Sequence, residues 1–257
     1  MKNKSDRYDK LKRCNFLNNS DIEKLRNARV LIFGAGGVGT NLVQNIAASG
    51  IGHIGLIDND IIEPRNLSIQ ILYNEEVIGR YKVDVCKEWV NKYDSSIDIK
   101  TYNLRLDENN WQDIVKDYDI LLDAFDTSKS VTLINKISVL TEKPLVHAGT
   151  INDIGTIWTT IPKKTPCLQC MDDYEDSLKV PDDYPYGVLQ SVGAIIASLQ
   201  TFEAIKLILN KGVLIAKSIT VLHGMIGLIK RRKLYYSKTN ICPICGQPRA
   251  SLTPFKE

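Results

Sequence analysis

A glycine-rich string at residues 34–39, GAGGVG, constrains the fold of this chain more than any other feature. It follows a short apolar run, Val30 to Phe33, and precedes a segment from about Val38 to Ser49 with a helical pattern. A continuous apolar run of this length fits a strand buried on both faces of a parallel sheet. Strand, glycine turn and helix in this order predict a doubly wound α/β fold with a nucleotide site.

Each glycine of the string has a physical role in such a site. Gly34 makes the tight turn, Gly36 and Gly37 let backbone N–H groups approach a phosphate, and Gly39 lets the helix pack close to the sheet. Asp58 follows the next predicted strand, 19 residues after Gly39, where a carboxylate would accept bonds from ribose hydroxyls. The alternative is a structural glycine turn with a surface aspartate.

Strands and helices alternate beyond this unit, which favours a mainly parallel Rossmann-like sheet. After Gly149 the pattern changes to β-rich segments around one long helix, so a C-terminal β-rich portion is expected. Ser20-Asp21-Ile22-Glu23 predicts a capping box that opens a first helix ending near Ala28. The expected strands are 54–57, 97–102, 120–124, 145–148, 156–161 and 218–222, and the further helices are 83–92, one around Trp111, 131–141 and 190–210.

Two charged residues favour ATP over a nicotinamide cofactor. An ATP-cleaving site needs a cation on the phosphates and a carboxylate for magnesium, because the charge on the transferring phosphate must be neutralised. Lys82, in Gly79-Arg80-Tyr81-Lys82, and Asp126, at the end of a strand, fit these roles. Taken singly, Lys82 is more simply a solvated lysine at a helix start and Asp126 a helix N-cap.

Four cysteines form two CxxC pairs, which predict a structural zinc site. Cys167 and Cys170 precede Cys242 and Cys245, with 71 residues between the two pairs. Two thiolates at this spacing bind one metal from a tight turn, and a second pair completes a closed tetrahedral shell. A redox dithiol is the alternative, and it fits a single CxxC better. Cys14 and Cys86 are expected to be buried or incidental thiols.

Composition limits the partners and the location. Lys and Arg (33) nearly balance Asp and Glu (30), so the chain lacks the basic excess of nucleic-acid-binding proteins, and no nucleic acid is expected. The N-terminal segment has no secretory signal, and the longest apolar stretch, residues 188–209, carries Gln200, Glu203 and Lys206. We therefore expect a cytoplasmic protein without a membrane partner.

The order of these motifs resembles the ThiF/MoeB/HesA family of ubiquitin-activating-like adenylyltransferases. The resemblance covers nearly the whole chain. Within the family, LIDNDIIEPRNL, the segment 147–154 and the segment 79–82 are most similar to MccB-type members, which activate a ribosomal peptide. The resemblance implies one adenylation domain over 1–257, with a helical arm (1–28), a nucleotide-binding half (29–155) and a zinc-binding and substrate or dimer half (156–257).

The resemblance also implies a reaction and roles for residues. The C-terminal carboxylate of a peptide or ubiquitin-like sulfur-carrier protein would attack the α-phosphate of ATP, which leaves an acyl-adenylate and pyrophosphate. The glycine turn would hold the nucleotide, Asp58 the ribose, Lys82 the phosphates and Asp126 magnesium. Asp60 and Asn66 would also line the site. Family members are homodimeric, and the small residues of the helix 190–210 fit either a dimer interface or core packing.

Three departures from the family pattern bear on activity. Ile69 replaces an arginine that would contact the triphosphate, and Lys10 replaces an arginine supplied by a partner subunit. Lysine keeps the charge but loses the planar fork of arginine. Arg65 or Arg7 are candidate substitutes. Residues 172–191 contain no cysteine, so no covalent thioester is expected, and this acidic segment is either a crossover loop over the acyl site or a surface loop.

Two other functions compete with adenylation. A binding module that keeps the fold but has lost turnover is favoured by Ile69 and Lys10. A nicotinamide-dependent oxidoreductase is disfavoured because no hydride-transfer acid is apparent; His53, His147 and His223 are more simply residues at strand ends or turns.

Overall fold

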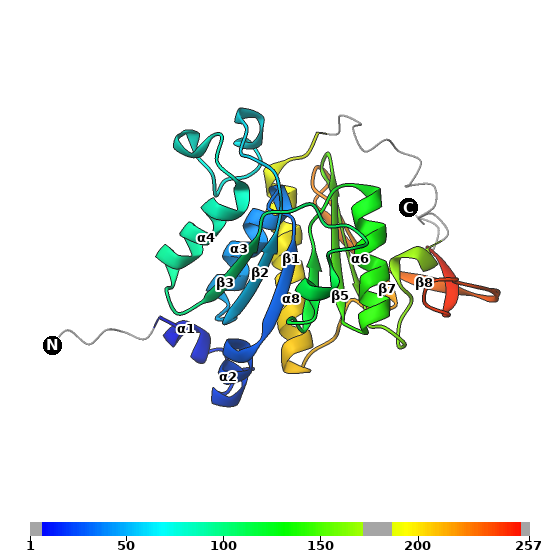
Figure 1. Ribbon diagram of the computed structural model, residues 1–257. Helices are drawn as coiled ribbons and strands as arrows, with labels where there is room; N and C mark the ends of the chain where they lie inside the picture. The colour runs from blue at the N-terminus through cyan, green and yellow to red at the C-terminus, as the bar shows by residue number, and fades with distance from the viewer. Residues whose placement is uncertain (1–6, 172–186, 253–257) are drawn as a thin grey trace.

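A nine-stranded sheet runs through the computed structural model, which describes residues 7–171 and 187–252 (Figure 1). The strand order is β3-β2-β1-β4-β5-β6-β7-β8-β9. Strands β1 to β5 are parallel, and every pairing from β5 to β9 is antiparallel. The strands are β1 (Arg29–Phe33), β2 (His53–Ile57), β3 (Asp98–Tyr102), β4 (Ile120–Asp123), β5 (Leu145–Ile151), β6 (Ile154–Thr160), β7 (Ser218–His223), β8 (Leu228–Ile241) and β9 (Pro248–Leu252).

Helices cover both faces of this sheet, as the doubly wound fold class predicts. One core lies under α3, α4 and α8, and the other lies under α5 and α6. The helices are α1 (Asp9–Lys12), α2 (Asn19–Asn27), α3 (Gly37–Ala48), α4 (Lys82–Tyr93), α5 (Gln112–Val115), α6 (Ser128–Thr141) and α8 (Gln190–Leu209), with 3₁₀ turns η1 (Pro64–Asn66), η2 (Glu75–Val77) and η3 (Leu168–Cys170).

Strand β1 shows why a continuous apolar run predicts a central strand. All four residues from Val30 to Phe33 are fully buried. Val30 and Ile32 belong to the α3 side of the sheet, and Leu31 and Phe33 to the α6 side. Because a central parallel strand has helices on both faces, each of its side chains is in a core. The fold class predicted from the sequence is confirmed.

The first helix begins earlier than expected. Asn18 is the N-cap of α2: its side chain accepts from the Asp21 N–H at 3.0 Å, while Asp21 Oδ2 accepts from the Asn18 N–H at 2.9 Å. The prediction of Ser20 as the cap was therefore wrong, although a capping box is present. Asp21 serves as the third residue of the helix because Asn18 also supplies a capping oxygen.

Helix α8 is apolar on all sides. Of the residues that the structure describes, it is the one helix long and apolar enough to cross a membrane, but half of it is buried within this fold. A Cβ on Gly193 would lie 3.1 Å from the Gly37 carbonyl oxygen, and Ala197 is fully buried. These two small residues let α8 pack closely against α3 and the sheet, so the core-packing interpretation holds for them.

Candidate nucleotide site and cysteine cluster

The carboxyl ends of β1, β2 and β4 meet where the strand order reverses. Strand β1 pairs with β2 on one side and with β4 on the other, so the chain leaves β1 in one direction and returns on the other side. In open α/β sheets a ligand binds at such a switch point. The loop of residues 58–81 rises above this edge, whereas α1 and α2 lie at the opposite edge (Figure 1).

The glycine turn divides into two structural and two open positions. Gly34 has φ of +100°, and a Cβ there would lie 2.8 Å from the Ala124 carbonyl oxygen. A Cβ on Gly39 would lie only 2.0 Å from the Gly34 carbonyl oxygen. At Gly36 the nearest atom to a Cβ would be 3.9 Å away, and at Gly37 3.5 Å. Gly34 and Gly39 are thus required by packing, while Gly36 and Gly37 leave space beside the start of α3.

Asp58 ties the end of β2 to the glycine turn. Its Oδ2 accepts from the Ala35 N–H at 2.7 Å, and its Oδ1 accepts from the Asp60 N–H at 2.8 Å. Burial raises the pKa of the Asp58 carboxyl, although the positive charge of Lys82 and the two backbone hydrogen bonds oppose this shift. Each carboxylate oxygen keeps a second lone pair, so Asp58 can still accept from a ligand hydroxyl.

Lys82 is buried at the start of α4, with 5% of its surface exposed. Its Nζ lies 2.8 Å from Asp60 Oδ2, in a pair whose aspartate side chain is 62% exposed. This burial excludes the solvated lysine considered from the sequence. A buried ammonium needs a partner, and because the Asp60 carboxylate is largely exposed, this pair can also accommodate an anionic ligand.

Asp126 lies three residues beyond β4, and its carboxylate is exposed. The N-cap of α6 is Thr127, whose side chain accepts from the Ser130 N–H. Asp126 is therefore not the helix cap considered from the sequence. Gly34 of the glycine turn contacts Ala124, two residues before Asp126. An exposed carboxylate at this position is suited to a hard cation.

The loop that contains Asn66 lies against the glycine turn. Asn66 Oδ1 accepts from the Glu63 N–H at 2.9 Å, so this side chain already shapes its own loop. A Cβ on Gly37 would meet the Ile69 carbonyl oxygen at 3.5 Å, and the amide nitrogen of Gln70 is the nearest atom to a Cβ on Gly36. Ile69, the replacement for an arginine, therefore lies beside the glycine turn.

The N-terminal cations lie far from this edge in the same chain. Arg7 approaches Asp94 at 3.6 Å and covers the Tyr93 ring at 4.9 Å. These two residues are at the carboxyl end of α4, whose twelve residues span roughly 18 Å from Lys82. Lys10 is in α1, beside Arg7. Arg65 pairs with Glu63 and is 82% exposed.

The two cysteines outside the CxxC pairs differ in exposure. Cys86 is fully buried in α4, and burial raises the pKa of its thiol to about 12, although the Tyr73 hydroxyl opposes the shift. Cys14 is half-buried. A thiol with a raised pKa is a poor nucleophile at neutral pH, so Cys86 is not placed for covalent catalysis.

Sequence reasoning missed a hydrogen-bonded pair beside the site. His147 Nδ1 lies 2.7 Å from Asp123 Oδ2. The structure confirms strand-end positions for His53, at the start of β2, and His223, at the end of β7, but places His147 inside β5, so that prediction was wrong. The parallel register that sets Asp123 opposite His147 was not readable from either segment alone.

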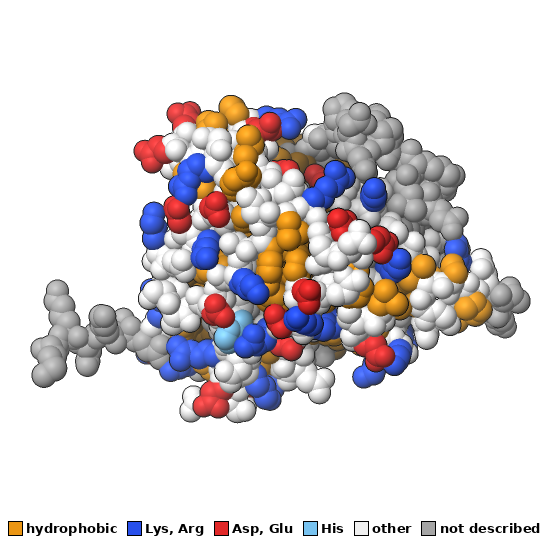
Figure 2. Space-filling view, viewed as in Figure 1, with side chains coloured by type: hydrophobic (Ala, Val, Ile, Leu, Met, Phe, Trp, Pro, Cys, Tyr) orange, Lys and Arg blue, Asp and Glu red, His pale blue; other side chains and the backbone are white. Residues whose placement is uncertain are grey.

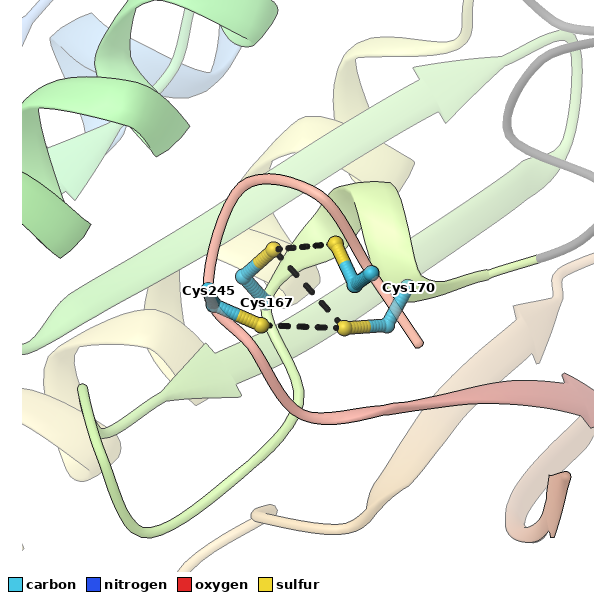
Figure 3. Close-up of side chains that lie close together, drawn as sticks. Cys167, Cys170 and Cys245 are labelled. Carbon is cyan, nitrogen blue, oxygen red and sulfur yellow. Dashed lines mark hydrogen bonds between the residues drawn. The ribbon is translucent and has the colours of Figure 1, made fainter. Parts of the chain in front are cut away.

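The four cysteines of the two CxxC pairs come together at one point, and their sulfur atoms all lie within 4.8 Å of one another (Figure 3). Cys167 Sγ is 3.8 Å from both Cys170 Sγ and Cys242 Sγ, and Cys170 Sγ is 3.2 Å from Cys245 Sγ. Thiolates at the corners of a tetrahedron with metal–sulfur bonds of ~2.3 Å would be ~3.8 Å apart. The donor set and spacing therefore fit zinc, with no position left for a substrate.

Comparison with known proteins places this geometry in a family. The family model "ThiF family" matches residues 8–244. The chain is 32% identical over 224 residues to the adenylyltransferase and sulfurtransferase MOCS3 of Culex quinquefasciatus, covering 87% of this chain and 51% of that protein. It is 30% identical over 230 residues to the sulfur carrier protein adenylyltransferase of Thermus thermophilus, covering 87% of this chain and 84% of that protein.

Solved structures agree with the sequence comparisons. A crystal structure of Escherichia coli MccB with ATP superimposes with a TM-score of 0.76 at 30% identity, covering 88% of this chain and 69% of that chain. MccB with AMPCPP and MccA gives 0.79 at 29% identity, covering 95% and 75%. The chain spans about half the length of the MOCS3 proteins that it matches. From its glycine turn, its paired CxxC motifs and a match over residues 8–244, the chain belongs to the ThiF family.

Proposed function

We propose that this protein is an adenylyltransferase that activates the C-terminal carboxylate of a peptide or a ubiquitin-like sulfur-carrier protein with ATP. The observation that carries the proposal is the buried Lys82 ammonium, tied through Asp60 and Asp58 to a glycine turn with two open positions. A cation at this place suits a triphosphate, whereas a hydride-transfer cofactor has no comparable need for it.

The reaction we infer forms one bond and breaks another at the α-phosphorus. A carboxylate oxygen of the substrate attacks the phosphorus, the bond to the bridging oxygen of pyrophosphate breaks, and an acyl-adenylate remains. No proton has to move, because the attacking carboxylate is ionised at neutral pH. The residues needed are therefore clamps that hold the two groups in line. Lys82 would neutralise the phosphates, and Asp58 would fix the ribose.

Two metal ions fit the described residues. Magnesium bound at Asp126 would supply a positive charge next to the phosphates. Zinc bound by the four cysteines would supply folding energy rather than chemistry, since thiolates fill all four positions. We further propose a cytoplasmic location, where thiols remain reduced and free to bind a metal.

A second candidate function is that of a binding module, which keeps the fold but does not catalyse adenylation. Ile69 favours this candidate. This apolar side chain lies beside Gly37, where an arginine would place a charge on the phosphates. The loss of such a clamp can cost several kcal/mol of transition-state stabilisation. A protein of this kind would bind ATP and its partner without forming pyrophosphate.

We also propose a homodimer, and the exposed face of α8 supports it. Ile195 is 40% exposed and Phe202 is 59% exposed, and they share one face of the helix because they are seven residues apart. Figure 2 shows a different face of the molecule, on which hydrophobic side chains lie in patches between charges of both signs. A helix that is apolar on all sides is normally covered on all sides. Sedimentation analysis of Phe202→Glu against the parent protein tests this proposal.

Exchange of labelled pyrophosphate into ATP tests the proposed activity. The purified protein is incubated with ATP and magnesium, together with candidate sulfur-carrier proteins or with short precursor peptides. We expect exchange with one of these classes, and a loss of about 10²–10³-fold in Asp126→Ala. Asp113→Ala, another exposed aspartate, is the matched control and should keep full exchange.

Three outcomes separate the candidate functions. Tight ATP binding without exchange for any partner would favour the binding module. Selective binding of NAD⁺ would overturn the nucleotide assignment. Exchange that survives in Asp126→Ala would remove this residue from the proposed site.

A further inference from the structure

His147 and Asp123 form a pair that none of the proposed nucleotide contacts uses. Asp123 is fully buried at the end of β4, and the side chain of His147 is 16% exposed in β5. The contact between Nδ1 and Oδ2 is 2.7 Å. The other oxygen of Asp123 accepts from the Phe125 N–H at 3.1 Å. A buried carboxylate held by these two donors fixes the orientation of the imidazole ring and leaves Nε2 facing away from Asp123.

The pair lies next to the candidate nucleotide site. Asp123 is the partner of Phe33 in the β1–β4 register, and Phe33 precedes Gly34 of the glycine turn. The next residue, Ala124, contacts Gly34, and the exposed Asp126 follows two positions later. His147 is the partner of Asp123 in the β4–β5 register. The imidazole is therefore one strand from the segment 124–126 that follows β4, and two strands from the glycine turn that follows β1.

The surroundings of Nε2 are open toward the same edge. Strand β4 ends at Asp123, whereas β5 continues to Ile151, so β5 has no strand neighbour on its β4 side beyond His147. Nε2 lies 3.6 Å from the position of a Cβ on Gly149, which has no side chain to cover it. No hydrogen bond joins Nε2 to another residue in the described part of the chain.

The residues opposite His147 on β6 and in the core beneath α6 are uncharged, so Asp123 is its charged partner. From β6, Trp158 lies opposite His147, and Thr156 lies opposite Gly149. From α6, the core of this sheet face contains Val131 and Ile134. None of these four side chains titrates near neutral pH. When both ring nitrogens carry protons, Nδ1 donates to the Asp123 carboxylate and Nε2–H is a charged hydrogen-bond donor.

We propose that His147 receives the C-terminal carboxylate of the acid substrate by donating a hydrogen bond from Nε2, with Asp123 as its positioning residue. This inference rests on the proposed adenylation and deepens it, because it names the residue that selects a free carboxylate. Because His147 lies one strand from the segment 124–126 and two strands from the glycine turn, its Nε2–H would hold the acid beside the proposed phosphate site. A substrate with a blocked C-terminus cannot form this charge-assisted contact.

Imidazole NMR on the full chain tests the contact without turnover. The protein has three histidines, so His147→Gln assigns the resonance directly. The probes are glycylglycine and glycylglycine amide, each added with magnesium and a non-cleavable ATP analogue. We expect the free acid to shift the His147 ring-nitrogen signal and to raise its measured pKa, while the amide leaves both unchanged. In Asp123→Asn the response to the acid should fall about tenfold, as expected for loss of the charged partner.

Kinetics supply a second readout that a purely structural role would not move. With a substrate that supports pyrophosphate exchange, His147→Gln should raise the KM for that substrate about tenfold or more and leave the KM for ATP unchanged. His53→Gln is the matched control, because His53 also pairs with an aspartate, Asp98, but lies at the opposite edge of the sheet.

The two proposals fail in different ways. Equal responses to the acid and the amide, or none, together with unchanged KM values in His147→Gln, would overturn the role of His147 and leave adenylation intact. An acid-specific response of His147 in a protein that shows no exchange with any partner would support the carboxylate contact and contradict the proposed activity.

Discussion

The two halves of the sheet are stabilised in different ways. In the parallel half, β1 is buried on both faces, and its four apolar residues are fully enclosed. In the antiparallel half, β8 leaves Ile229 56% exposed and Tyr235 62% exposed. Hydrophobic burial therefore stabilises the first half, whereas β8 and β9, at the end of the second half, bury few side chains, and we expect them to depend on the four cysteines. A site that needs rigid geometry lies on the half that is stable by burial.

Loss of the metal should produce the largest difference in stability between the two halves. Cys242→Ser, or removal of zinc by a chelator, should unfold β8 and β9, because zinc contributes on the order of 10 kcal/mol to small zinc modules. Hydrogen exchange by mass spectrometry should show fast exchange in β8 and β9 and continued protection in β1 and β4. Cys14→Ser is the matched control and should bind one zinc per chain. A metal-free protein with protected C-terminal strands would contradict this account.

Substitutions at two glycines of the parallel half should distinguish a glycine required for packing from one that leaves room for a ligand. Gly39→Ala would place a Cβ 2.0 Å from a backbone oxygen, so we expect a loss of about 1–3 kcal/mol in the free energy of unfolding. Gly36→Ala has 3.9 Å of space and should fold normally while binding ATP more weakly. Urea denaturation and ATP titration measure the two effects. Equal stabilities for the two variants would refute the division of the turn into structural and open positions.

A partly exposed ion pair between α2 and the segment after α8 gives the smallest expected effect. Lys211, beyond α8, pairs with Asp21 of α2 at 2.5 Å, and this hydrogen bond lowers the pKa of the Asp21 carboxyl. The pair should stabilise the fold above the ordinary aspartate pKa of ~3.9 and lose its effect as the pH falls below it. Asp21→Asn should lower Tm by a few degrees at pH 7, and this difference should shrink toward pH 3. A pH-independent difference would exclude the ion pair as the cause.

Much of the parallel half was predictable, because strands such as β1 and β4 are apolar runs between turn signals. The C-terminal strands were harder. Strand β8 reads LIKRRKLYYSKTNI, and with exposed side chains on both faces it has no clean alternation of apolar and polar residues. Strand β9 was missed as well; it is short and follows the second CxxC pair. Exposure on two faces removes the pattern on which strand prediction depends.

The site was predictable in its parts rather than in its contacts. The glycine string, Asp58, Lys82 and the cysteines each carry a local signal. The pairs of Lys82 with Asp60 and of His147 with Asp123 join segments 22 and 24 residues apart. The β4–β5 register brings the second pair together, and a bridge between Ile61 and Tyr81 brings the first pair together. The helix start at Asn18 was ambiguous for a different reason: Asn18 and Ser20 both offer a capping oxygen three residues before an acid.

Gln200 gives helix α8 a mechanical connection to the site. Its side-chain amide donates to the Asp123 carbonyl at 2.9 Å and to the Val146 carbonyl at 2.8 Å, so one buried group ties the last residue of β4 to the second residue of β5. Any shift of α8 along its axis must either break both bonds or displace the strand end that precedes Asp126. If a second subunit covers the exposed face of α8, assembly and nucleotide affinity would be thermodynamically linked, and each would strengthen or weaken the other by the same factor.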